Sequence, residues 1–482
     1  MTLTLHAAFK KIKWLALLAG ASSLCIGAQA AESHVSGGRY GDVTVEWPHG
    51  EMRGFVVLFS AGKGWTAADS QAAHALAERG ALTVGVDTGQ YAANLAKTGK
   101  ACRHLDGDAE AVSHQLERQL KSDRYFAPIM AGTGQGATLA LHVLAQAPSN
   151  TIAGAVAVDA DAKLDHDFFQ CPPDPTISRG SALPGFVETG VTKPRAVTAM
   201  QQAERSAVKE GADSPDFHFD KDAARLTVPL LAKSPRMFAT TATRADQLTA
   251  LVEPHLQQAD TGGDQDVSDL PLVELPAAHP NGKLAIVISG DGGWRDLDKT
   301  IGEQLQKDGV SVVGWDALRY FWSEKTPEQV SRDLSRVLRV YGARWHATSY
   351  ALVGYSFGAD VMPFAYNRLP APLRDKVSIV ALLGFAKAAD FQVRVTGWLG
   401  MPPSDKALPA KPAVDRLPSG LVQCFYGADE EDTLCPALTE TQEVIRTSGG
   451  HHFGHDYDAL EKRILSGWDK RLHEEGGGQA AR

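Results

Sequence analysis

Ser356 stands at the centre of a Gly-x-Ser-x-Gly pentapeptide, residues 354–358. The apolar run 350–353 before it predicts a buried strand, and residues 359–368 after it predict a helix that ends before Pro370. In a strand, tight turn and helix of this kind, the flanking glycines let two backbones pass closely, and the strained turn lifts the serine hydroxyl above the sheet. The pattern therefore predicts a nucleophile elbow at Ser356, against the alternative of a glycine-rich turn without chemistry.

A serine nucleophile needs a histidine base and an acid that orients the histidine. In this fold class the acid and then the histidine follow the serine along the chain. A predicted strand enters an acidic loop in which Asp432 is the preferred acid, because it lies shortly before a proline at the end of the penultimate strand. Asp429 and Glu430 are alternatives in the same loop. The base is His451 or His452, in a Gly-Gly-His-His-Phe turn after one more short strand, and the spacing does not separate them.

The two halves of the chain repeat one pattern. Eight residues of the first half recur at a fixed offset: Ser60, Gly64, Trp65, Asp69, Gly80, Gly85, Asp87 and Tyr91 return as Ser289, Gly293, Trp294, Asp298, Gly309, Gly314, Asp316 and Tyr320. Each set accompanies an apolar strand, a glycine-rich turn, an amphipathic helix and a second strand, which is typical of parallel sheets covered by helices. The sequence predicts an α/β protein with two α/β-hydrolase-like domains in tandem.

The first of these domains is predicted to lack the nucleophile. Gly134 stands where Ser356 stands in the second half, and the first half contains no Gly-Gly-His turn. Residues 132–137 also fit a dinucleotide-binding fingerprint, but the register shared with the second elbow explains them better. We therefore expect the first domain to keep the fold without catalysis, and we expect no cofactor in either domain.

The start of the chain and its charge indicate where the protein works. Three lysines precede an apolar segment and a small-residue cleavage site, which predicts a signal peptide over residues 1–30 and a periplasmic protein. We expect the first domain over residues 31–265 and the catalytic domain over residues 270–475, joined by a polar linker. Removing residues 1–30 takes away three lysines and no acids, so 57 acidic side chains would face 45 basic ones (48 less 3). This balance argues against nucleic acid as a partner.

Export would place the cysteines beyond the signal peptide in an oxidising compartment. These are Cys102, Cys171, Cys424 and Cys435. The simplest pairing that respects the two halves joins Cys424 to Cys435 and Cys102 to Cys171. The first bond would staple the strand to the acidic loop and hold Asp432 against the histidine. Four buried thiols are the alternative.

Four motifs of the second half together resemble the VirJ/AcvB family of bacterial virulence proteins. They are the Ser-Gly-Asp-Gly-Gly-Trp turn at 289–294, the elbow with its continuation at 354–360, the Tyr-Gly loop that ends at Cys435-Pro436, and the histidine turn at 449–453. The resemblance implies a periplasmic α/β-hydrolase that cleaves the aminoacyl ester of lysyl- or alanyl-phosphatidylglycerol at the membrane surface. It also implies a link to virulence and, for some members, to type IV secretion components.

The proposed chemistry assigns roles to residues around the serine. The oxyanion of a tetrahedral intermediate is expected to bind the N–H of Phe357 and one N–H from the turn at Gly290 and Asp291. A cationic aminoacyl substrate calls for carboxylates near the nucleophile, and the candidates are Asp291 and Asp360, unless these only cap helices or face solvent. The histidine turn could contribute metal ligands, but no matching second ligand cluster is evident, so no metal is expected.

Two other functions stay open. The chain could be a non-catalytic periplasmic protein linked to type IV secretion, or an esterase or thioesterase of other specificity. All three triad residue types are kept in one half while the nucleophile is lost in the other, which favours an enzyme over a scaffold.

Overall fold

The structure is a computed structural model, and it describes most of the chain beyond residue 32. The described residues are 33–62, 64–98, 104–147, 151–164, 168, 185–193, 196–199, 202, 235–256, 267–394 and 403–480. The predicted signal peptide lies outside these residues, as do Cys102 and Cys171 with their predicted disulfide. Glu32–Arg482 form one compact unit that includes both halves.

The first half builds an eight-stranded sheet with the strand order β1-β2-β4-β3-β5-β6-β7-β8. Its strands are β1 (Ser33–Ser36), β2 (Asp42–Glu46), β3 (Gly54–Phe59), β4 (Ala81–Val86), β5 (Ile129–Thr133), β6 (Gly154–Val158), β7 (Phe186–Val191) and β8 (Arg236–Met237). Its main helices are α1 (Ala67–Ala77), α2 (Thr88–Lys97), α3 (Asp106–Leu120), α4 (Gln135–Gln146) and α7 (Arg244–Val252). Only the pairs that involve β2 are antiparallel. This order, with the second strand reversed, is that of an α/β-hydrolase sheet.

The second half repeats the order in a seven-stranded sheet, β9-β11-β10-β12-β13-β16-β17. Its strands are β9 (Leu272–Leu275), β10 (Lys283–Ile288), β11 (Ser311–Trp315), β12 (Ser349–Tyr355), β13 (Val377–Leu383), β16 (Val422–Gly427) and β17 (Glu443–Thr447). Its helices are α8 (Asp296–Lys307), α9 (Ala317–Tyr320), α10 (Pro327–Arg344), α11 (Phe357–Tyr366), α12 (Ala371–Arg374), α13 (Lys411–Val414) and α14 (Tyr457–Ala480). Here only the β9–β11 pair is antiparallel, and β14 (Ala388–Ala389) pairs with β15 (Leu408–Pro409) in a separate small sheet. The predicted tandem of α/β-hydrolase-like folds is confirmed.

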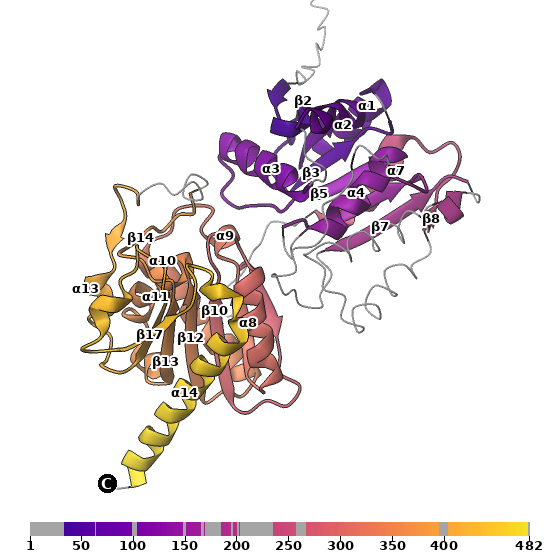
Figure 1. The fold of residues 1–482 in the computed structure, drawn as a ribbon. Helices are drawn as coiled ribbons and strands as arrows, with labels where there is room; N and C mark the ends of the chain where they lie inside the picture. The colour runs from indigo at the N-terminus through magenta and orange to yellow at the C-terminus, as the bar shows by residue number, and fades with distance from the viewer. Residues whose placement is uncertain are drawn as a thin grey trace, which may run out of the picture. The chain divides into compact units, whose positions relative to one another are not determined.

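Helices cover both faces of the second sheet, because its strands are apolar on both sides. Leu284 and Ile286 of β10 pack in one core with α10 and α11, whereas Ala285 and Val287 pack in another with α8 and α14 (Figure 1). Strands buried on both faces read as continuous apolar runs, which is why they could be found in the sequence. The carboxyl edge of this sheet is therefore a rigid base for a site.

The elbow region differs slightly from the prediction. The helix predicted to begin at residue 359 is α11, which begins at Phe357, directly after the turn. It starts earlier because Ser356 is itself the N-cap residue, so strand, turn and helix follow without a spacer. The predicted domain limits at residues 265 and 270 stay a prediction. Among the described helices, none combines the length and apolar character that crossing a membrane requires.

Candidate active site

Ser356 lies at the sharp turn between β12 and α11, with φ 50° and ψ −118°. A positive φ is strained for serine, and the packing of the flanking glycines holds it. A Cβ on Gly354 would lie 2.5 Å from the backbone of Gly358, and a Cβ on Gly358 would lie 2.2 Å from the carbonyl oxygen of Ile288. Strand β12, helix α11 and strand β10 can approach this closely only because both positions are glycine.

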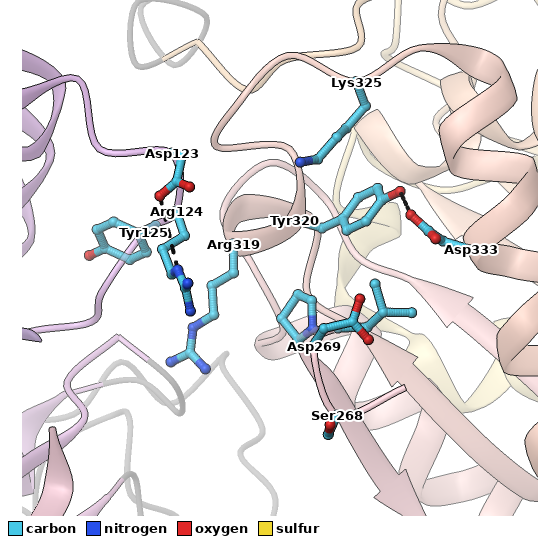
Figure 2. A pocket seen from close by; sticks show the side chains of 11 residues that line it. Asp123, Arg124, Tyr125, Ser268, Asp269, Arg319, Tyr320, Lys325 and Asp333 are labelled. Carbon is cyan, nitrogen blue, oxygen red and sulfur yellow. Dashed lines mark hydrogen bonds and ion pairs between the residues drawn. The ribbon is translucent and has the colours of Figure 1, made fainter. Parts of the chain in front are cut away.

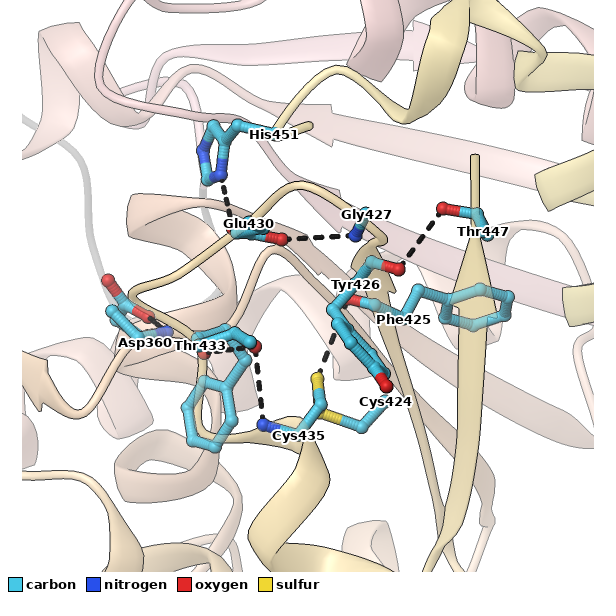
Figure 3. The surroundings of a disulfide bond; sticks show 12 residues. Asp360, Cys424, Phe425, Tyr426, Gly427, Glu430, Thr433, Cys435, Thr447 and His451 are labelled. Carbon is cyan, nitrogen blue, oxygen red and sulfur yellow. Dashed lines mark hydrogen bonds and ion pairs between the residues drawn. A yellow bond between two sulfur atoms is a disulfide. The ribbon is translucent and has the colours of Figure 1, made fainter. Parts of the chain in front are cut away.

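A chain of hydrogen bonds runs from Ser356 through His451 to Glu430. Nε2 of His451 lies 2.9 Å from Oγ of Ser356, and Nδ1 lies 2.6 Å from Oε1 of Glu430. The other carboxylate oxygen of Glu430 accepts from the N–H of Gly427 at 3.2 Å, as Figure 3 shows. A carboxylate at Nδ1 fixes the tautomer in which Nε2 can take the serine proton. The arrangement is that of a serine hydrolase.

Asp432 does not hold the position of the acid, so that prediction was wrong. Its carboxylate pairs with Nζ of Lys387 at 3.1 Å and its side chain is 73% exposed, whereas that of Glu430 is 8% exposed. The loop after β16 turns back at once, because the N–H of Glu430 donates to the carbonyl of Gly427 at 3.0 Å. Glu430, one of the alternatives in the same loop, therefore reaches the histidine first.

The predicted disulfide between Cys424 and Cys435 is present and closes the loop that carries Glu430. Cys424 lies in β16 and Cys435 begins a short helical turn after the loop. The loop also meets the histidine turn closely, since a Cβ on Gly427 would lie 2.1 Å from the carbonyl oxygen of Gly450. The covalent bond and this backbone contact together hold the acid against the base.

Gly384 is a site residue that the sequence reasoning missed. It follows β13 with a φ of 66°, and a Cβ there would lie 2.6 Å from Cε1 of His451. The absent side chain makes the space that the imidazole occupies. No motif marks this glycine, and its only sequence signal is its place directly after the strand that neighbours the elbow strand.

His452 lies beside the serine–histidine pair and bonds elsewhere. Its Nδ1 lies 3.1 Å from the hydroxyl of Tyr355, and its ring stacks on that of His455 with centroids 5.9 Å apart. Partial desolvation of the ring lowers the pKa of His452, and the neighbouring His451 and His455 lower it further, so the ring is neutral at pH 7. The choice that the sequence left open falls on His451.

We expect the variants His451→Gln and His452→Gln to differ sharply. The first removes the base and should lower kcat for ester hydrolysis by on the order of 10⁴- to 10⁶-fold. The second keeps a neutral polar group at its place and should change kcat by less than about tenfold. Steady-state rates on p-nitrophenyl acetate measure both. Modest, equal losses in the two folded variants would refute the assignment of His451.

A cavity of about 430 Å³ opens beside Ser356. It lies between the segment 290–298 and the side chains of Tyr355, His451 and His452. Within the described part of the chain, no three side chains of the metal-ligating types gather as a metal site would require.

The predicted oxyanion donors come from two segments, the start of α11 and the turn at Gly290 and Asp291. The N–H of Phe357 belongs to the first turn of α11, where N–H groups have no acceptor within the helix, and it directly follows the nucleophile, as an oxyanion donor would. A backbone hydrogen bond from Gly290 counteracts part of the rise in the pKa of Asp298. The second donor, predicted from the turn at Gly290 and Asp291, stays a prediction.

Three carboxyl groups line the cavity: Asp291, Asp296 and Asp298. Burial raises the pKa of Asp298 well above its ordinary value, and the nearby Asp296 raises it further. Asp291 and Asp296 are partly exposed. Both line the cavity beside Ser356.

Asp360 is not among the residues that line the cavity, and its predicted contact with a substrate ammonium group stays a prediction. Its Oδ1 accepts from the N–H of Ala386 at 2.8 Å, and Figure 3 shows it apart from Glu430 and His451. Burial raises the pKa of Asp360 well above its ordinary value. Its carboxyl group ties α11 to the loop after β13.

The first half keeps the backbone of the elbow but has no serine at its turn. Gly134 has φ 55° and ψ −124°, close to the values of Ser356. The N–H of Gln135, the counterpart of Phe357, donates to the carbonyl oxygen of Ala61 at 3.0 Å. The amide that would bind an oxyanion is thus already bonded, and the residue before it has no side chain.

Known proteins resemble the chain in part. Residues 282–472 match the family model described as bacterial virulence protein (VirJ). A search of the curated proteins found no match. Among solved structures, Est1E from Butyrivibrio proteoclasticus is 15% identical, with 42% of this chain and 93% of that one covered and a TM-score of 0.31. MenH from S. aureus is 12% identical (42% and 98% covered, TM-score 0.32), and the Pyrococcus furiosus esterase Pf2001 is also 12% identical (44% and 97% covered, TM-score 0.32).

Proposed function

We propose, from the match of residues 282–472 to the VirJ family model, that the chain is a serine hydrolase that cleaves the aminoacyl ester of lysyl- or alanyl-phosphatidylglycerol. The single observation that carries the hydrolase chemistry is the hydrogen-bond chain Ser356–His451–Glu430 beside a cavity. The aminoacyl lipid follows from the resemblance to the family, and the carboxyl groups that line the cavity support a cationic substrate.

The geometry supports a two-step reaction. His451 takes the proton of the Ser356 hydroxyl as Oγ attacks the ester carbonyl carbon, and Glu430 stabilises the imidazolium that forms. The oxyanion of the tetrahedral intermediate accepts hydrogen bonds from the N–H of Phe357 and from the 290–293 turn. The C–O bond to the glycerol hydroxyl of the lipid then breaks, and His451 returns the proton to that oxygen. In the second step His451 takes a proton from a water molecule, and the water oxygen attacks the carbonyl carbon of the acyl-enzyme. The bond to Oγ of Ser356 breaks, His451 returns the proton to Oγ, and the free amino acid leaves.

The substrate also suggests where the reaction takes place. An aminoacylated phospholipid lies in a membrane, so the chain would work at the membrane surface of the periplasm, in line with the predicted signal peptide. Contact with type IV secretion components stays a prediction from the resemblance.

The experiment is to incubate the purified chain with phosphatidylglycerol vesicles that contain lysyl-phosphatidylglycerol, and in parallel alanyl-phosphatidylglycerol, and to measure free amino acid. We expect release by the native chain. Hydrolysis of p-nitrophenyl acetate without release from either lipid would leave a serine esterase of other specificity and refute the lipid substrate.

Asp296→Asn tests recognition of the amine. A charge-assisted contact is worth roughly 1.5–3 kcal/mol, so the variant should lose about 10- to 100-fold in kcat/KM on the lysyl lipid. It should lose much less on neutral p-nitrophenyl acetate. The matched control is Asp458→Asn, which changes an aspartate on α14 that accepts from Gln304 at 2.8 Å. Equal losses on both substrates would assign Asp296 to the architecture of the turn.

A further inference from the structure

One face of α3 forms part of the contact between the first half and the second. Glu110, His114 and Arg118 of this helix follow at i, i+4 and i+8, so they share that face, here called the α3 contact face. The ring of His114 lies 5.4 Å from that of Trp322 in the second half. Glu110 and Arg118 make polar contacts across the same boundary. We propose that the α3 contact face holds both sides of the oxyanion site, which makes the non-catalytic half an activator built into the same chain.

The first side is the glycine turn, which Arg295 links to the first half. Nη1 of Arg295 donates to Oε1 of Glu110 and to Oγ1 of Thr151, each at 3.3 Å. The side chains of Glu110 and Arg295 are only 14% and 24% exposed, so water screens the pair weakly. The guanidinium lies against Gly292, where a Cβ would be 2.7 Å from Nη2. Two acceptors of the first half thus fix the side chain that backs this turn.

The turn that Arg295 backs reaches the nucleophile directly. A Cβ on Gly290 would lie 3.7 Å from Cβ of Ser356, which is ordinary contact. The turn carries both Gly290 and Asp291, from which the second oxyanion donor is predicted. A movement of Arg295 therefore moves the donor and not only the surface of the protein.

The second side is held by Arg118. Its Nη1 donates to the carbonyl oxygen of Trp322 and its Nη2 to that of Val393, both at 2.6 Å. The guanidinium also lies over the ring of Trp322, 3.7 Å from its centroid. Charge-assisted bonds and a cation–π contact are among the stronger polar interactions in proteins. One side chain of the first half thus joins two segments that are distant in the sequence.

These two segments support the other oxyanion donor. The N–H of Val393 donates to the carbonyl of Phe321 at 2.9 Å. The ring of Phe321 packs on that of Phe357, with centroids 4.8 Å apart. Phe357 follows the nucleophile and supplies the first donor. The N–H of Phe357 and the turn at 290–293 are therefore each linked to the α3 contact face by a short series of contacts.

Small displacements matter at such a site. A donor stabilises an oxyanion only at roughly 2.7–3.1 Å, and a misplacement of about 1 Å can lower a rate by about 10²-fold. A cavity of about 570 Å³ opens beside the α3 contact face, between Tyr125 of the first half and Arg319, Tyr320 and Lys325 of the second (Figure 2). We expect single substitutions on the face to displace the donors without separating the halves, because Tyr125 also packs on Trp322.

The test uses the full chain with Glu110→Gln and, separately, Arg118→Gln. The matched control is Glu328→Gln, which removes the partner of Arg368 in an exposed ion pair of the second half. The readout is the maximal rate on p-nitrophenyl acetate per active serine, where the concentration of active serine is found by titration with a fluorophosphonate. We expect a loss of about tenfold in each test variant with KM little changed, because displaced donors weaken the transition state alone. The control should change kcat by less than about twofold. Glu110→Asp, which keeps the charge, should recover part of the loss.

A merely structural role gives a different result. It would lower the melting temperature and the titratable fraction while kcat per titrated serine stays at the native value, and that outcome would overturn the proposal. Hydrogen exchange gives a measurement without catalysis: the amides of 290–296 should exchange about tenfold faster in Glu110→Gln but not in Glu328→Gln. Unchanged exchange would also overturn it. Since the proposal rests on ester hydrolysis, a native chain without esterase activity would refute the proposed function, while the exchange experiment would still decide the role of the first half.

Discussion

Ser356→Ala should reduce ester hydrolysis by on the order of 10⁶-fold, because the variant has no group that can form the acyl-enzyme. The change removes one oxygen atom from a partly exposed side chain, so the fold should persist. Alanine at this position keeps the positive φ that the glycines on either side impose. The measurement is kcat on p-nitrophenyl acetate and the release of lysine from the lysyl lipid.

The control for this substitution is Ser466→Ala, an exposed serine on α14. Native-like melting of both variants, with activity lost only in the first, identifies the nucleophile. A fluorophosphonate should label the native chain and the control, but not Ser356→Ala. Turnover by the folded Ser356→Ala variant within about tenfold of the native rate would remove this serine from the mechanism.

Glu430→Gln should lower kcat by about 10³- to 10⁴-fold, with KM little changed. The amide is the same size as the carboxylate, but it can offer Nδ1 of His451 a donor, which selects the wrong tautomer. It also leaves the imidazolium of the transition state without a counter-charge. The comparison variant is Asp432→Asn, which changes a carboxylate two positions away that is paired with Lys387 at the surface.

Asp432→Asn should keep kcat within about threefold of the native value, since exposed ion pairs contribute little. Glu430→Asp, which keeps the charge but shortens the side chain, should fall between native and Glu430→Gln. A large loss in Asp432→Asn with a small one in Glu430→Gln would reverse the assignment and restore the prediction made from the sequence.

The sequence was sufficient where local pattern determines structure. Continuous apolar strands and the glycines around Ser356 predicted the elbow, and the register shared with Gly134 predicted the second sheet of the same kind. The disulfide between Cys424 and Cys435 followed from an even cysteine count and proximity along the chain. Each of these features depends on residues within a short segment or on a repeated spacing.

The sequence was insufficient where loop geometry or long-range placement decides. Four acidic residues follow one another in one loop, at positions 429–432. Which of them faces the histidine depends on the backbone hydrogen bonds of the loop, among them the one from Glu430 to Gly427. Whether His451 or His452 faces the serine depends on how the histidine turn meets Gly384, a residue with no motif around it. The contacts of Arg118 join parts of the chain more than 200 positions apart, with sequence separations of 204 and 275. No spacing rule could have revealed them.

The two elbows also show why the first half could not easily become catalytic again. A Cβ on Gly134 would lie 2.9 Å from the carbonyl oxygen of Ala61. Mutating Gly134 to serine would therefore meet the backbone itself, and relief would require rebuilding the turn at Ala61 as well. Regaining the nucleophile would thus require two changes together, a serine at position 134 and a rebuilt turn at Ala61. A duplicated copy in this state is free to acquire other duties without competing for the reaction.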